Sequence, residues 1–172
     1  MPYGKSEYRV IRVTPTLDTN AYADDDVFFN ATEIPQAVIG NGGCSELKAI
    51  TILNEDDVAH DIDIVFMQVE KDLGTINDAV GSGSKWTNAL AKAAGVLGVV
   101  KVDWSTNSED LVNNLVYHTS SGNHGAAVTS GLPLFLQAAD DSTSVYMAAV
   151  SRGGTPTVAA DDYEFALHIQ YR

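Results

Sequence analysis

Residues 163–171, with the sequence YEFALHIQY, constrain the fold of this chain more than any other stretch. The odd-numbered residues are aromatic or aliphatic and the even-numbered ones are mostly polar, so an extended chain places the two sets on opposite faces. A strand that is apolar on one side needs hydrogen-bonded neighbours and a second layer against its apolar face. The fold is therefore predicted to close over this strand.

The length of the chain, 172 residues, is that of a single domain with one core. Hydrophobic residues make up 45% of the chain and charged residues 19%, which indicates an ordered globular protein. Residues 1–7 are mostly polar and contain Pro2 and Gly4. We therefore expect a flexible N-terminal leader over residues 1–7 and one β-sandwich domain over residues 8–172.

The chain is strongly acidic, because 23 Asp and Glu residues outnumber 10 Lys and Arg residues and give a net charge of −13. A negative surface repels phosphate groups, so we expect no nucleic-acid partner and no contact with anionic membranes. We also find no secretory signal and no apolar run near the ~20 residues that span a bilayer. These features predict synthesis in a cytoplasm.

Short β-rich segments separated by turns follow one another along the chain, and we predict about eight to ten strands. Residues 61–69 are apolar on both faces, which predicts that the opposing sheet covers one face and another element or subunit covers the other. In residues 45–53 we expect strict alternation, with Leu47, Ala49, Thr51 and Leu53 on one face. The remaining candidate strands are residues 8–14, 27–29, 33–39, 96–102, 115–117, 132–138 and 145–150.

One segment has the features of a helix, at about residues 85–94. Ser84 is placed to cap its start and Gly95 to cap its end, with several alanines between them. Trp86 falls on the face of this helix that we expect to pack against a sheet. Because no alternating strand and helix units are present, the predicted fold class is all-β, a jelly-roll-like β-sandwich with one short helix.

No residue is singled out as catalytic, cofactor-binding or metal-binding. The four histidines have no spacing typical of a metal site, and the sequence identifies no Ser, His and acid set. We therefore expect no enzymatic activity and no cofactor. The histidines are His60, His118, His124 and His168.

Several local patterns have a structural and a functional interpretation. Residues 81–85 lack the spacing of a phosphate-binding loop and are read as the loop before the helix. The acidic groups at residues 24–26, 55–57, 140–141 and 161–162 are read as solvated turns, with calcium binding as the alternative. Cys44 is expected to be a small buried residue. Trp104 is the better candidate for a surface aromatic residue that stacks on a sugar.

Several short motifs, spread over residues 8–171, resemble those of small structural proteins encoded beside the head genes of tailed bacteriophages. The motifs are VTPTLDT at 13–19, VFF at 27–29, EIP at 33–35, LGTIN at 73–77, DSTSVY at 141–146 and VSRGGTPT at 150–157. The resemblance implies a capsid decoration (cement) protein, which is a jelly-roll module, often a homotrimer, on the outer surface of the virion capsid. Its implied partners are copies of itself and the major capsid protein.

Two other functional classes remain open, a carbohydrate-binding module and an enzyme, and a fibre, tail or neck protein is a further possible placement within the virion. A carbohydrate-binding module also uses a β-sandwich with acidic loops and surface aromatic residues. A jelly-roll hydrolase or isomerase would need histidines and carboxylates that converge on inward positions, whereas most polar candidates here fall in predicted turns.

Overall fold

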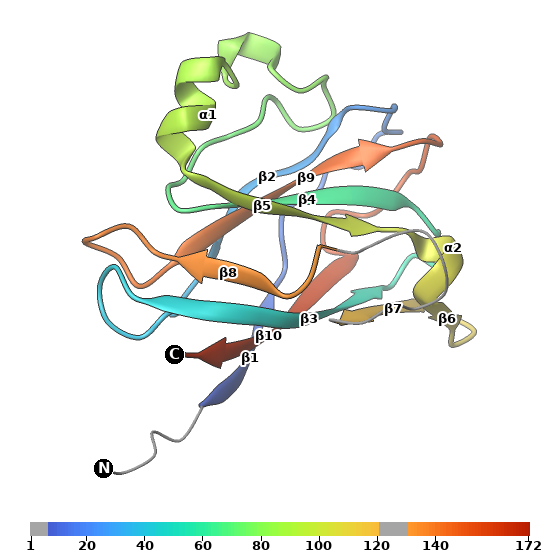
Figure 1. Ribbon diagram of the computed structural model, residues 1–172. Coiled ribbons are helices and arrows are strands. Elements are labelled where there is room, and N and C mark those ends of the chain that lie inside the picture. The colour runs from blue at the N-terminus through green and yellow to red at the C-terminus, as the bar shows by residue number, and fades with distance from the viewer. Residues whose placement is uncertain (1–6, 121–130) are drawn as a thin grey trace.

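The protein is a sandwich of two antiparallel β-sheets, seen in a computed structural model that describes residues 7–120 and 131–172 (Figure 1). Residues 1–6 of the expected leader and His124 lie outside the described residues. The strands are β1 (Tyr8–Val13), β2 (Val27–Ile34), β3 (Cys44–Asn54), β4 (Asp61–Met67), β5 (Val96–Val102), β6 (Ser108–Asp110), β7 (Leu115–Ser120), β8 (Leu134–Gln137), β9 (Val145–Arg152) and β10 (Tyr163–Tyr171).

The order of the strands is that of a jelly roll. One sheet has the order β1-β10-β3-β7-β6, with β8 also paired to β3, and the other has the order β2-β9-β4-β5. The pairs are nested, since β1 pairs with β10, β2 with β9, β3 with β8 and β4 with β5. A long hairpin that is rolled up into two sheets produces this nesting. The predicted all-β jelly-roll sandwich is confirmed.

The last strand lies near the centre of the larger sheet, between β1 and β3. All of its odd-numbered residues are buried, as the alternation predicted. The ring of Tyr163 lies 5.1 Å from that of Phe28, and the ring of Phe165 lies 5.4 Å from that of Phe29, so β10 and β2 join the two sheets through edge-on aromatic contacts.

Strand β3 does not alternate throughout, and this part of the prediction is wrong. His168 of β10 is opposite Ala49, but the next residue, Ile169, is opposite Leu47. Lys48 is therefore an additional residue, and this β-bulge reverses the faces of the residues that follow it. Ile50 and Ile52 consequently face the core, while Thr51 and Leu53, which were predicted on the face of Leu47, lie on the outer face.

The predicted helix begins later than expected. Helix α1 spans Asn88–Ala94, and its N-cap is Thr87, whose side chain accepts a hydrogen bond from the backbone N–H of Leu90. Ser84 instead ends a 3-10 turn, η1 (Ser82–Ser84), with a φ of 59° that is unsuited to an N-cap. The C-cap is Gly95 with a φ of 61°, as predicted. Trp86 precedes the helix and is half-buried.

The segment that contains α1 covers the outer face of the four-stranded sheet (Figure 1). Met67 of β4 is fully buried there, in a second cluster that includes Leu73 and Ala94. Cover on both faces of β4 was predicted, and the protein's own chain supplies it. A second short helix, α2 (Trp104–Asn107), follows β5, and no helix of the described residues is long and apolar enough to cross a membrane.

Strands β7 and β8 lie end to end along β3, because β7 pairs with the second half of β3 and β8 with its first four residues. Pro133 immediately precedes β8, in agreement with the predicted strand start. Leu134 of β8 packs on Gly98 of β5, where a Cβ atom would lie only 2.6 Å from Leu134 Cδ1. Strand β8 thereby brings the two sheets together on one side of the sandwich.

Candidate functional site

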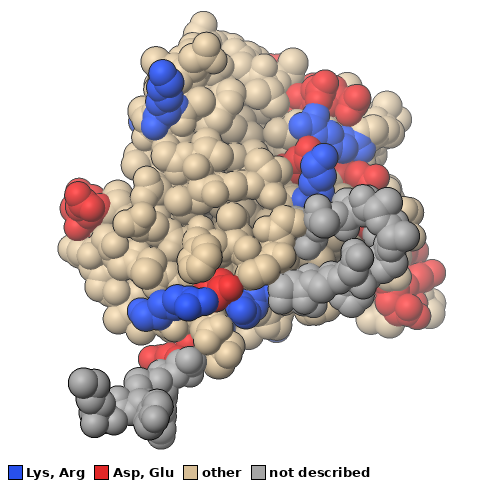
Figure 2. All heavy atoms as spheres, in the orientation of Figure 1, with Lys and Arg blue, Asp and Glu red and all other residues tan. Residues whose placement is uncertain are grey.

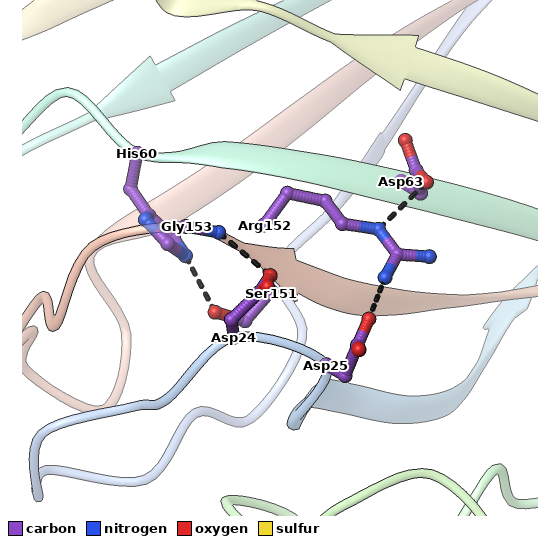
Figure 3. Close-up of polar contacts among 7 residues, drawn as sticks. All are labelled: Asp24, Asp25, His60, Asp63, Ser151, Arg152 and Gly153. Atoms are coloured by element: carbon purple, nitrogen blue, oxygen red, sulfur yellow. Dashed lines mark hydrogen bonds and ion pairs between the residues drawn. The ribbon is translucent and has the colours of Figure 1, made fainter.

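A histidine and a serine meet in the interior beside an acidic loop (Figure 3). His60 immediately precedes β4, and Ser151 lies near the end of β9, opposite Ile62 of β4. This antiparallel register brings His60 Nε2 to 2.9 Å from Ser151 Oγ. Both side chains are buried, with relative exposures of 4% for His60 and 0% for Ser151.

An acidic residue lies close to the pair. Asp24 Oδ1 accepts a hydrogen bond from the backbone N–H of Gly153 at 2.9 Å. Burial lowers the pKa of His60 to about 4, although the negative charge of Asp24 acts in the opposite direction. The imidazole is therefore neutral at pH 7, and it can either donate to or accept from the serine hydroxyl.

Serine, histidine and aspartate are the residues of a nucleophilic triad, but the surroundings of this pair favour a structural role. A nucleophile has to contact its substrate, whereas Ser151 Oγ lies in the interior. The backbone of Ser151 is also engaged, since its N–H donates to Asp26 and its carbonyl accepts from Asp25. The side-chain pair satisfies two buried polar groups, and the backbone of Ser151 attaches residues 25 and 26 to β9.

Arg152, the next residue along β9, holds the same loop from the solvent side. Its guanidinium forms ion pairs with Asp25 and with Asp63 of β4, the latter at 2.8 Å (Figure 3). A shallow hollow of about 380 Å³ lies beside it and is also lined by Asp61 and Lys101. Among the carboxylates of the hollow, Asp63 pairs with Arg152, and Asp61 accepts a hydrogen bond from the backbone N–H of Trp104 at 2.9 Å. The hollow is open and lined mostly by charged residues, unlike the enclosed and mainly apolar pockets typical of small-molecule sites.

Members of two of the acidic groups, residues 24–26 and 161–162, cap turns, and so does Asp18. Asp18 Oδ1 accepts from the N–H of Asn20 at 2.7 Å, and Asp26 Oδ2 accepts from the N–H of Ala23 at 2.7 Å. Asp162 accepts from the N–H of Ala159 in the same way. Within residues 7–120 and 131–172, no three His, Cys, Asp or Glu side chains are grouped closely enough to hold a metal ion.

Two other histidines lie on the outer face of the six-stranded sheet. Thr51 Oγ1 is 2.8 Å from His118 Nδ1 and 3.2 Å from His168 Nε2, and the two rings are 6.0 Å apart at 90°. A threonine hydroxyl donates one hydrogen bond and accepts another, so it can serve both rings at once. This group occupies three neighbouring strands, β10, β3 and β7.

The structure decides two questions about single residues. Trp104, the better of the two tryptophan candidates for a surface aromatic residue, is only 1% exposed and packs against Tyr117 and Tyr163 in the core. Trp104 is the first residue of α2, whose N-cap is Asp103, and its side chain packs in the core against Tyr117 of β7. Cys44, predicted to be buried, is exposed, because it begins β3 on the outer face of the sheet.

The His60–Ser151 pair was not found from the sequence, since 91 residues separate its members and only the β4–β9 register joins them. Comparisons of the chain with protein-family models, curated proteins and solved structures give no match.

Proposed function

We propose that this protein is a non-enzymatic virion structural protein that decorates the outer surface of a capsid. In this role it associates with copies of itself and binds the major capsid protein, so that neighbouring capsomers are held together. The sequence motifs at residues 13–19, 141–146 and 150–157 motivate this proposal through their resemblance to phage structural proteins.

The observation that carries the proposal is the jelly-roll strand order with its nested pairs. The resemblance implies a jelly-roll module, and jelly rolls are the building blocks of many viral capsid and lectin domains. The fold therefore supports the class of protein that the motifs suggested.

Of these two jelly-roll classes, the lectin-like one is less well supported. Recognition of a sugar ring commonly uses an exposed aromatic residue as a platform, and Trp104 was the candidate for it. Because Trp104 is buried against Tyr117 and Tyr163, it cannot stack on a carbohydrate in the folded protein. The sealed position of Ser151 and His60 likewise favours binding over catalysis.

The mechanism is stabilisation through many simultaneous contacts. DNA packaged in a head exerts outward force on the shell, and a protein that binds two capsomers resists their separation. Each contact can be weak, because a second contact made by an already bound molecule occurs at high effective concentration. A ligand that binds only the assembled shell stabilises it by mass action.

The test compares phage heads that carry this protein with heads that lack it. Both are heated in steps, and the DNA that becomes accessible to a nuclease is measured. Heads without the protein are expected to release DNA at a lower temperature, and addition of the purified protein should restore the original temperature. Equal release temperatures would contradict the proposed role.

A further inference from the structure

We infer that the outer face of the six-stranded sheet is the surface through which copies of this chain bind one another. This inference deepens the proposed function and rests on its expectation of self-association. The segment containing α1 covers much of the outer face of the four-stranded sheet and leaves Val96 and Val99 of β5 exposed, whereas no described helix covers the outer face of the six-stranded sheet (Figure 1).

The strand register defines which side chains share this face. Tyr8 and Val10 of β1 are opposite Gln170 and His168 of β10, and Phe135 of β8 is opposite Glu46 of β3. Directly opposite residues point to the same side of a sheet, and Glu46 is itself opposite Gln170. Tyr8, Val10 and Phe135 are therefore on one face, with exposures of 67%, 47% and 61%.

The centre of the face is formed by small side chains and by a hydrogen-bonded polar group. Ala49 and Ala166 lie there among the hydrogen-bonded group of Thr51, His118 and His168. Small residues leave a shallow surface that another sheet can approach, and exposed aromatic residues such as Tyr8 and Phe135 belong to the residue types that are enriched in protein interfaces. The free edge of β1, which pairs only with β10 among the described strands, adjoins this surface.

The charges of this face are balanced, unlike those of the whole chain. Arg12 pairs with Glu164, and Glu46 pairs with both Lys48 and Arg172. Glu109 is opposite Val116 of β7 and lies on the same face. Three carboxylates, those of Glu46, Glu109 and Glu164, therefore stand against three cationic side chains. Among the described residues, the Lys, Arg, Asp and Glu side chains of this face therefore balance, so the excess of acidic residues behind the chain's net charge of −13 lies on other surfaces.

The charge distribution points to a second copy as the partner. Two copies repel each other when acidic surfaces meet, so self-association is favoured at a face without excess charge. A basic partner would be attracted to the acidic loops instead. Figure 2 shows that most of the acidic side chains visible in this view gather on the right-hand side of the molecule.

The test is the molecular mass in solution, measured by light scattering and sedimentation for the wild-type chain and two matched variants. Val10→Lys places a charge on the proposed interface, and Val96→Lys places one on β5 of the other sheet, where the valine is equally exposed (46% against 47%). Wild type and Val96→Lys are expected at two or more times the 18.3 kDa of one chain, with a trimer implied by the resemblance. Val10→Lys should need a protein concentration at least about tenfold higher to associate.

Cys44 provides a second readout in the unaltered sequence, because it is exposed and lies on the same face. In the associated wild type its thiol should react with a maleimide several times more slowly than in Val10→Lys. A wild-type mass of one chain at every concentration, or dissociation by Val96→Lys alone, would overturn the inference. If the protein is monomeric but still stabilises heads, the interface is wrong and the proposed stabilisation of the shell stands. If it associates through this face but does not stabilise heads, the proposed function is wrong and the interface stands.

Discussion

His60 Nε2 and Ser151 Oγ lie 2.9 Å apart in the interior, and the burial of this histidine makes the stability of the fold depend on pH. The histidine is neutral in the folded protein because burial lowers its pKa to about 4 from an ordinary value of 6.5. In the unfolded chain the same imidazole takes up a proton as the pH falls below its ordinary pKa. Between these two pKa values the unfolded state binds more protons than the folded state.

The free energy of unfolding should therefore decrease as the pH falls from 7 toward 4. The part due to His60 is fully present above its unfolded pKa and is lost as the pH approaches its folded pKa, with a total of about 3 kcal/mol. Urea unfolding at a series of pH values measures this decrease. His60→Gln keeps a hydrogen-bonding group beside Ser151 but cannot titrate, so its decrease over the same range should be smaller. Identical pH profiles for the two proteins would show that His60 is not the group responsible.

Trp104 should contribute to stability as a core residue. Trp104→Ala removes a side chain packed on Tyr117 and Tyr163, and the expected loss is about 3 to 5 kcal/mol in the free energy of unfolding. Trp104→Phe should cost clearly less than Trp104→Ala, because it keeps an aromatic ring in the core and removes an indole N–H that has no hydrogen-bond partner among the described residues. Denaturant unfolding followed by circular dichroism gives both values. A nearly neutral Trp104→Ala would contradict the buried position.

The start of helix α1 can be tested with two similar substitutions. Thr87→Ala removes the hydroxyl that accepts from the N–H of Leu90 and should lower the free energy of unfolding by about 1 kcal/mol. Ser84→Ala, at the cap position that the sequence suggested, should change it by less than about 0.5 kcal/mol. Thermal or urea unfolding distinguishes the two. The reverse ranking would place the start of the helix at Ser84.

Removal of divalent cations should leave the melting temperature unchanged. Asp18 and Asp26 accept hydrogen bonds from backbone N–H groups in their own turns, and Asp25 and Asp63 pair with Arg152. These carboxylates have partners without a metal ion. Thermal melting is measured with and without a chelator, and again after calcium is restored. A midpoint that falls with the chelator and recovers with calcium would establish a metal site.

The regular parts of the fold could be predicted because they follow from local patterns. The alternation at residues 163–171 is uninterrupted, so it identifies the buried face of β10 directly. Gly95 and Pro133 act through their own backbone geometry, and their positions at a helix end and a strand start were correctly predicted.

The remaining features depend on contacts between distant segments. The bulge at Lys48 arises where β3 pairs with β10, and nothing near Lys48 in the sequence signals the change of face. The position of Trp104 depends on a short helical turn that directs it toward Tyr117, and Cys44 is exposed because of its place in the strand register. The same reasoning explains why the meeting of His60 with Ser151 could not be predicted.

The most direct test of the proposed function is the number of copies of this protein in a purified virion, determined by quantitative mass spectrometry against the major capsid protein. A protein that decorates the outer shell should be present in hundreds of copies per particle. Its absence from virions would contradict the proposal, and only a few or a dozen copies would contradict the placement on the shell and indicate the tail or neck.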